Sequence, residues 1–268
     1  MSKAYPRFCG FFPSVKSDLI NAIDRLLPAN GLGYGQISTI WTVILGLQLR
    51  LDLNQLPSFR AQDFVESGSN AQAVAQIKAW PHWHGGSLAL IGPEGCGKSH
   101  LAKIWQDQTG AHLLRTDRDT DLASLSGQPV LIDGLEGQFT DETLFHLINM
   151  AGLPGGGLLI TARTAPTLWT VQLPDLGSRL KALPTAQIDE PDDLVLEGVL
   201  RRFFQQHNIR PADDLLPYLL RRIERSVPAA RDLVIQLDAM ADADGKPISK
   251  ALARQFFEIM DQTPDLFA

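Results

Sequence analysis

The 268-residue chain has little of what secreted and membrane-spanning proteins depend on. Its two cysteines, Cys9 and Cys96, are too few for a disulfide framework. The longest uncharged apolar run, Ile37 to Leu47, is too short to cross a bilayer, and no positively charged region precedes a cleavable apolar stretch at the start. We therefore expect a cytoplasmic protein that does not associate with a membrane.

The chain also lacks an excess of positive charge. It has 24 Lys and Arg against 30 Asp and Glu, which gives a formal net charge of -6 at pH 7. This balance argues against a broad electrostatic surface for nucleic acid. With 44% hydrophobic and 20% charged residues, the composition is that of a globular protein and excludes disorder, collagen and coiled coil.

The middle of the chain alternates short apolar runs with helical stretches. The runs are Leu88 to Ile91, Val130 to Ile132 and Leu158 to Thr161, and the helices are expected at His100 to Gln108 and Asp141 to Met150. Runs without polar alternation are typical of strands buried on both faces. The pattern predicts an α/β fold with a parallel sheet.

After Ile188 the composition becomes helical throughout. Apolar residues recur at helical spacing, and Pro and Gly mark the joints between segments. The four predicted helices are Pro191 to His207, Ala212 to Arg225, Ala229 to Ala241 and Ile248 to Met260. We expect a small all-helical domain after the α/β domain.

The strongest local signal is a phosphate-binding loop between an apolar run and a predicted helix. Glycines let backbone N–H groups turn toward a phosphate, and a helix N-terminus adds positive potential. The loop fits G-x-x-x-x-G-K-[ST] and consists of Gly92, Pro93, Glu94, Gly95, Cys96, Gly97, Lys98 and Ser99, with His100 following. We expect Lys98 to reach the β- and γ-phosphates and Ser99 to ligate Mg²⁺.

A second motif follows at Val130 to Asp133, where an apolar run ends in a carboxylate. This arrangement predicts that Asp133 holds Mg²⁺ beside the phosphate loop. Gly134 stands where hydrolysing relatives of this architecture usually carry a second acid, and whether Glu136 substitutes is open. Nucleotide binding is therefore better supported than hydrolysis by this chain itself.

The chain from Gln48 onward resembles the Hda family, the DnaA-related regulators of replication initiation in the AAA+ class. The loop GPEGCGKSHL is similar to the family's Walker A motif, and VLIDGLEG to its Walker B motif. DFVES at Asp63 to Ser67, with Ser69-Asn70, is similar to the entry segment that holds the adenine end of the nucleotide. The resemblance implies an AAA+ P-loop NTPase core, a helical lid, bound ADP or ATP, and Mg²⁺.

Three further residues take roles only through this resemblance. LLITARTAP matches the sensor 1 strand, with Thr161 facing the γ-phosphate region, and LPDLGSRL matches the box that holds an arginine finger, which implies this role in trans for Arg179. AARDLVIQLDAM resembles the sensor 2 helix, with Arg231 near the phosphates. Each arginine can also be read as an ordinary surface charge.

The segment Gln48 to Leu53, QLRLDL, resembles the family's peptide for the sliding clamp, the β subunit of DNA polymerase III. An extended segment would present Leu49, Leu51 and Leu53 to an apolar groove, while Gln48 makes a hydrogen bond. The alternative is an edge strand. The expected domains are an N-terminal extension over 1–47 that the pattern leaves undetermined, a clamp-binding segment and linker over 48–60, a nucleotide-binding domain over 61–190, and a lid over 191–268.

The resemblance implies regulatory inactivation of DnaA, in which a clamp-tethered protein stimulates hydrolysis of DnaA-bound ATP. It also implies a nucleoid- or replisome-associated location and allows a homo-oligomer. The acidic balance, and the few residues after Arg254, argue against direct sequence-specific DNA binding. A self-sufficient P-loop ATPase and a DNA-binding initiation or helicase-loading factor stay open as alternatives.

Two smaller signals have plain structural readings. His82 and His84 form a metal site only if further ligands lie nearby. Cys96 stands at a helix N-terminus, which lowers a thiol pKa, but a small residue that fits the loop explains it as well.

Overall fold

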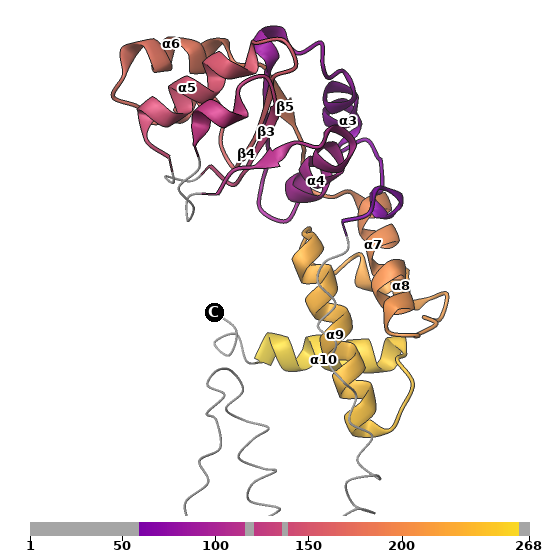
Figure 1. Ribbon diagram of the computed structural model, residues 1–268. Coiled ribbons are helices and arrows are strands. Elements are labelled where there is room, and N and C mark those ends of the chain that lie inside the picture. The colour runs from indigo at the N-terminus through magenta and orange to yellow at the C-terminus, as the bar shows by residue number, and fades with distance from the viewer. Residues whose placement is uncertain (1–58, 116–120, 136–138, 263–268) are drawn as a thin grey trace, which may run out of the picture. The chain divides into compact units, whose positions relative to one another are not determined.

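The computed structural model describes residues 59–115, 121–135 and 139–262, all of which belong to one compact unit, Pro57–Ala268 (Figure 1). Five parallel strands form one sheet in the order β2-β3-β4-β1-β5. The strands are β1 (Ser87–Ile91), β2 (His112–Leu113), β3 (Pro129–Asp133), β4 (Gly157–Ala162) and β5 (Thr185–Gln187). This arrangement confirms the predicted α/β fold with a parallel sheet.

Helices cover both faces of the sheet (Figure 1). α3 (Ala71–Lys78) and α4 (Lys98–Thr109) pack on one face, and α5 (Asp141–Ala151) and α6 (Pro174–Ala182) pack on the other. The strands supply both cores because their side chains alternate between the faces. In β1, for example, Leu88 and Leu90 join the α3–α4 core while Ala89 joins the α5–α6 core. The sheet is therefore buried on both sides, as the apolar runs predict.

The register of the strands decides which residues meet at the carboxyl edge of the sheet. Asp133 of β3 lies opposite Thr161 of β4, and Ile91 of β1 lies opposite Ala162 of β4. The loops that follow β1, β3 and β4 therefore begin side by side. In parallel α/β sheets, ligands bind at this edge.

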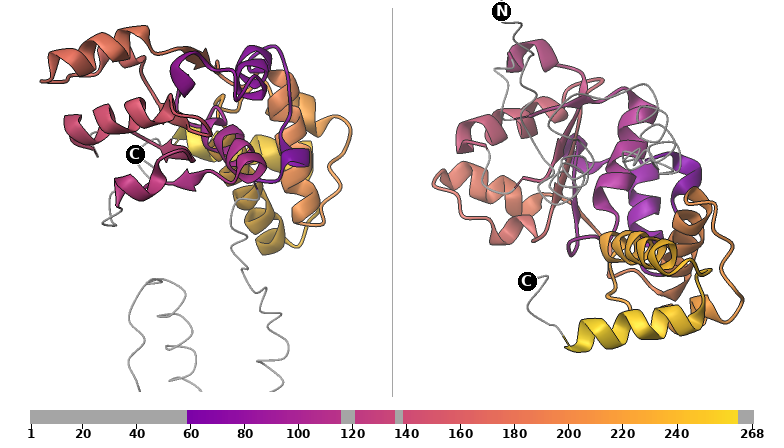
Figure 2. Two further views of the ribbon diagram at one scale, coloured as in Figure 1. Left: turned by 45° about the horizontal axis from the view of Figure 1, so that its top comes forward. Right: turned by 90° about the horizontal axis from the view of Figure 1, so that it is seen from below.

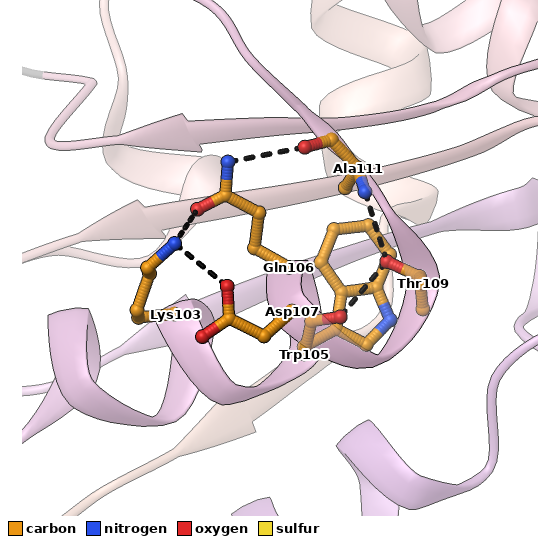
Figure 3. A network of polar contacts seen from close by, with 6 residues as sticks. All are labelled: Lys103, Trp105, Gln106, Asp107, Thr109 and Ala111. Atoms are coloured by element: carbon orange, nitrogen blue, oxygen red, sulfur yellow. Dashed lines mark hydrogen bonds and ion pairs between the residues drawn. The ribbon is translucent and has the colours of Figure 1, made fainter. Parts of the chain in front are cut away.

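The C-terminal end of α4 is fastened to the chain that enters β2 (Figure 3). Gly110 ends the helix in the left-handed conformation, with φ 70°. The Thr109 hydroxyl donates to the Trp105 carbonyl (2.8 Å) and accepts from the Ala111 N–H (3.3 Å), and the Gln106 amide donates to the Ala111 carbonyl (3.1 Å). These bonds fix the helix that begins at the phosphate loop against the sheet.

Four further helices follow β5 and share a core of their own, and Figure 2 shows them grouped together in two more views. They are α7 (Asp193–Gln206), α8 (Leu215–Leu219), α9 (Val227–Asp244) and α10 (Lys250–Gln262). α8 is shorter than the predicted Ala212 to Arg225, because the chain leaves the helix after Leu219 and turns toward Ser226, whose hydroxyl caps α9. None of the described helices is long and apolar enough to span a membrane.

Candidate functional site

The phosphate loop runs from β1 into α4 and depends on glycine at positions of close approach. A Cβ atom on Gly92 would lie 2.3 Å from the Ile188 carbonyl oxygen, and one on Gly95 would lie 2.8 Å from Pro228 Cδ. Gly92 and Gly95 also have positive φ values of 157° and 71°. Only glycine fits such positions without displacing backbone or ring atoms.

Lys98 begins α4 and folds back into the loop. Its Nζ donates to the carbonyl oxygens of Gly92 (2.8 Å) and Pro93 (2.6 Å). An ammonium group has three donors on a flexible stem, so it can exchange these carbonyls for phosphate oxygens without moving the helix. The structure therefore places the Lys98 charge inside the predicted phosphate site.

Ser99 and Asp133 come together from α4 and β3. The Ser99 hydroxyl donates to Asp133 Oδ1 at 3.0 Å, and both residues are exposed. A hydroxyl and a carboxylate at hydrogen-bond distance form the oxygen pair that Mg²⁺ prefers next to phosphates. The two residues predicted to hold the metal are thus neighbours in the fold.

Thr161 braces this pair from the adjacent strand β4. Its side chain is only 2% exposed, and its hydroxyl donates to Asp133 Oδ1 (2.7 Å) and accepts from the Gly134 N–H (2.8 Å). A hydroxyl has a single hydrogen to donate, and phosphate oxygens only accept. While Thr161 holds Asp133, it therefore has no donor for the γ-phosphate, although the resemblance places it in that region.

Gly134 occupies the position after Asp133 with φ 85°, which side-chain-bearing residues rarely adopt. A Cβ built there meets nothing within 4 Å, so the backbone conformation and not crowding disfavours a second acid. Glu136, the other candidate acid, lies outside the described residues. The backbone at position 134 therefore has a conformation that favours glycine over an acidic residue.

Cys96 is buried within the loop. Burial raises the pKa of its thiol, and the nearby charge and hydrogen bonds of Lys98 only partly oppose this. Since the thiolate is the reactive form, a raised pKa makes the group less reactive. The structure supports the reading of Cys96 as a small residue that fills space.

His100 faces the segment that enters the domain. Its Nε2 lies 2.9 Å from the Arg60 carbonyl oxygen and donates to it, and its ring makes edge contacts with Phe59 and Phe64. Burial lowers the pKa of His100, and the charge of Arg202 acts in the same direction. His100 therefore joins the phosphate-loop helix to the entry segment.

The entry segment is also held by α7. Asp63 forms a half-buried ion pair with Arg202, with Oδ2 and Nη2 2.7 Å apart. One helical turn before Arg202, a Cβ on Gly198 would lie 2.8 Å from Val65 Cγ2. The segment that the resemblance assigns to the adenine end of the nucleotide thus contacts both α4 and α7.

The N-terminus of α9 docks on the phosphate loop. The Val227 N–H donates to the Gly95 carbonyl oxygen at 3.0 Å. Arg231 follows in the second turn of α9 with a side chain that is about half exposed, and its Nε lies 3.5 Å from Asp232 Oδ1. The helix predicted to carry a phosphate-sensing arginine therefore begins at the loop itself.

Arg179 lies elsewhere, in the last turn of α6. Its guanidinium carbon is 4.9 Å from the centre of the Phe145 ring on α5, and the side chain is exposed. Asp141, one turn before Phe145, accepts from the N–H groups of Gln172 (2.6 Å) and Leu173 (3.0 Å) and so anchors the start of α6. Within the described part of the chain, no carboxylate lies within 4.0 Å of Arg179.

One residue at the site was missed by the sequence analysis. Arg163 follows β4, and its Nη2 lies 2.9 Å from Oε2 of Glu94 in the phosphate loop. The sequence does contain a signal for it, because Arg163 is the first charged residue after the apolar run Leu158 to Thr161. The contact of Arg163 with Glu94 arises because β1 and β4 are neighbours in the sheet, and local sequence patterns do not predict this strand order.

Other predicted residues fall outside this centre. Gln48, Leu49, Leu51 and Leu53 of the expected clamp peptide lie outside the described residues. His82 and His84 are described, but no group of three or more potential metal ligands exists in the part of the chain that the structure covers. The metal reading of these histidines gains no support.

Sequence comparison relates the chain to replication initiators. No family model matches. The chain is 25% identical over 237 residues to the chromosomal replication initiator protein DnaA of Bacteroides thetaiotaomicron, which covers 76% of this chain and 50% of that protein. It is 24% identical over 238 residues to DnaA of Bacteroides fragilis, with 76% and 49% coverage. The chain therefore spans about half the length of the curated relatives it matches.

Structural comparison gives the same fold. Domain III of the Thermotoga maritima replication initiation protein DnaA superimposes with a TM-score of 0.59 at 17% identity, over 74% of this chain and 95% of that domain. AMPPCP-bound DnaA from Aquifex aeolicus gives 0.61 at 15% identity, with 77% and 71% coverage. The Thermotoga maritima RuvB Holliday junction branch migration motor gives 0.53 at 18% identity, with 71% and 66% coverage. Most of this chain is therefore similar in sequence to about half of DnaA, and it has the α/β fold that these solved structures share.

Proposed function

We propose that this chain binds an adenine nucleotide and stimulates hydrolysis of the ATP bound to the initiator DnaA. It thereby acts as a negative regulator of replication initiation, as the resemblance to the Hda family implies. The observation that carries the proposal is the exposed Arg179, which lies at the end of a helix with no carboxylate of the described residues in ion-pair range. Such an arginine is available to a second protein.

The nucleotide part of the proposal is supported by the loop and its neighbours. Backbone N–H groups of Gly95 to Lys98 and the Lys98 ammonium would hold the phosphates, while Ser99 and Asp133 would hold Mg²⁺. Bound Mg²⁺ would neutralise charge on the phosphate oxygens. The AMPPCP in the similar Aquifex aeolicus DnaA supports an adenine nucleotide here, and either ADP or ATP fits these residues.

Arg179 would act on the partner's nucleotide and not on its own. During hydrolysis, water forms a bond to the γ-phosphorus as the bond to the β–γ bridging oxygen breaks, and charge accumulates on the phosphate oxygens. The guanidinium group donates two parallel hydrogen bonds to such oxygens. An arginine supplied in trans accelerates this step by roughly 10³- to 10⁵-fold in well-studied NTPases.

The conformation of Gly134 favours this regulatory role over a self-sufficient ATPase. A residue that polarises the attacking water would normally stand there, and φ 85° disfavours any side chain. We therefore assign slow or no hydrolysis to the chain's own site. Nucleotide would serve instead to order the domain.

The N-terminal part completes the proposal. Gln48, Leu49, Leu51 and Leu53 would dock on the sliding clamp, with residues 48–60 as segment and linker, 61–190 as the nucleotide-binding domain and 191–268 as the lid. A tether raises the effective concentration of the regulator near its target without new contacts. This would place the chain at the replisome on the nucleoid.

A hydrolysis assay tests the proposal. DnaA loaded with labelled ATP is mixed with this chain, Mg²⁺ and clamp loaded on DNA, and phosphate release is measured. We expect stimulation that Arg179→Ala abolishes and that Leu49→Ala reduces to the level seen without clamp. Lys181→Ala is the matched control, since Lys181 is another exposed cation in the last turn of α6.

Two results would contradict the proposal. Full stimulation by Arg179→Ala would remove the finger role. Phosphate release from this chain alone, lost on Lys98→Ala, would favour the self-sufficient ATPase.

A further inference from the structure

α5 and α6 lie side by side, and α5 contacts the segment of α6 near both of its ends (Figure 1). Near the start, the Asp141 carboxylate accepts hydrogen bonds from the N–H groups of Gln172 and Leu173. In the last turn, the guanidinium carbon of Arg179 lies over the Phe145 ring, 4.9 Å from its centre. Asp141 and Phe145 are four residues apart, so they share one face of α5. α5 therefore fixes the start of α6 and also contacts Arg179 itself.

The Phe145 ring is a rigid support for a flexible side chain. It is half-buried and packs against the core that α5 and α6 share, and its edge contacts the His146 ring with centres 6.3 Å apart. A phenylalanine side chain has only two torsions, and packing restricts both. An exposed arginine has many rotamers and loses much entropy when it is fixed. The ring therefore limits the conformations of Arg179 more than the backbone of α6 alone would.

The contact with the ring also leaves the N–H donors of Arg179 unused. Within the described part of the chain, Arg179 has neither an ion pair nor a hydrogen bond. Arg201 shows the contrast, because its Nε and Nη2 both donate to Glu197 Oε1. An aromatic ring attracts a cation through the negative face of its π system. Phe145 can thus orient the guanidinium group without competing for the donors that phosphate oxygens would need.

We propose that Phe145 is a positioning residue for Arg179, whose guanidinium group it directs toward the nucleotide of a partner protein. The inference rests on the proposed function, in which Arg179 acts on DnaA-bound ATP. Without the ring, Arg179 keeps its charge and its donors but spends less time in the productive geometry. Catalysis of phosphoryl transfer depends on such positioning. Loss of the ring therefore lowers the rate of hydrolysis in the complex and not the affinity for the partner.

The concentration dependence of stimulated hydrolysis tests this role. Phosphate release from ATP-loaded DnaA, with Mg²⁺ and clamp loaded on DNA, is measured at increasing concentrations of the full chain. We expect Phe145→Leu to lower the maximal rate about two- to fivefold, the range of an exposed cation–π contact, and to leave the half-saturating concentration unchanged. Phe145→Tyr keeps the aromatic face and should retain most of the maximal rate.

Phe139→Leu is the matched control. Phe139 is also half-buried against the α5–α6 core, but no Lys or Arg of the described residues lies over its ring. This variant should leave the maximal rate unchanged. Three results would overturn the assignment: a full rate with Phe145→Leu, equal losses with Phe145→Leu and Phe145→Tyr, or an equal loss with Phe139→Leu.

NMR of the full chain tests the contact without any partner. Protons above the face of an aromatic ring resonate upfield, so we expect upfield-shifted side-chain resonances for Arg179 in the unmodified chain and in Phe145→Tyr. In Phe145→Leu they should return to ordinary values. Unshifted resonances in the unmodified chain would overturn the proposal whatever the hydrolysis assay gives. If the shift is present but the unmodified chain does not stimulate hydrolysis, the proposed function fails, and the role of Phe145 in that reaction fails with it.

Discussion

Thr161 supports the predicted metal site from the adjacent strand, through its hydrogen bond to Asp133. Replacing it by valine keeps the shape but removes the hydroxyl, so the Gly134 N–H loses its acceptor and Asp133 loses a donor. We expect Thr161→Val to lower the free energy of unfolding by about 1–3 kcal/mol, as measured by urea denaturation, and Thr161→Ser to restore most of it.

Nucleotide binding by the same variants separates two roles for Thr161. If the hydroxyl orients Asp133, Thr161→Val weakens ATP and ADP alike and only when Mg²⁺ is present. If it contacts the γ-phosphate, the variant weakens ATP alone, and our reading of this hydrogen bond is wrong.

At the residue scale, the sequence predicts which side chains belong to the candidate site better than it predicts which side chains contact one another. The spacing of Gly92, Lys98 and Ser99 specifies a local loop whose conformation follows from neighbouring residues. The hydrogen bond between Thr161 and Asp133 joins two strands, and the ion pair between Arg163 and Glu94 joins two loops, that are distant in the chain. Their geometry follows from strand order and register, which local patterns do not encode.

At the scale of the element, α7 illustrates a packing requirement that overrides helix propensity. Gly198 lies inside the helix, where alanine would normally stabilise by up to about 1 kcal/mol. Its added Cβ would lie 2.8 Å from Cγ2 of Val65, a β-branched residue with little freedom to rotate. We expect Gly198→Ala to destabilise the protein by about 1–3 kcal/mol in urea unfolding.

A paired substitution checks the cause. Val65→Ala removes the clashing methyl groups, so adding it to Gly198→Ala should recover part of the lost stability. No recovery would show that Val65 is not the obstacle.

The elements themselves were predicted where a pattern is long. The central strands and most helices follow from apolar runs and helical periodicity. β5 (Thr185–Gln187) was not predicted, since only Ala186 of its three residues is buried and three residues show no period. α6 was not predicted either, because only Leu176 and Leu180 of this helix are buried. Two apolar residues do not distinguish a short helix from a loop.

At the scale of the whole molecule, nucleotide should stabilise both the sheet and the helices that follow it. A ligand at 100 times its dissociation constant adds about 2.7 kcal/mol to the free energy of unfolding. The Val227 N–H is bonded to Gly95, so ordering the loop should also protect the start of α9. We expect Mg-ATP to raise the melting temperature and to slow hydrogen exchange at Val227, and Lys98→Ala to abolish both effects.

Hydrogen exchange distinguishes this coupling from simple binding. If the melting temperature rises while exchange at Val227 is unchanged, the loop binds nucleotide without engaging α9. The proposed coupling of loop and helices would then be wrong.

The position of β1 in the sheet has a consequence for synthesis on the ribosome. β1 lies between β4 and β5, so Ser87 pairs with Leu158 and Ala89 pairs with Thr185. The strand that leads into the phosphate loop therefore emerges long before either of its neighbours. Parallel pairs so distant in sequence form late, because the intervening chain must first be closed into a loop. Nascent chains that end before β5 therefore leave one edge of β1 without its partner strand.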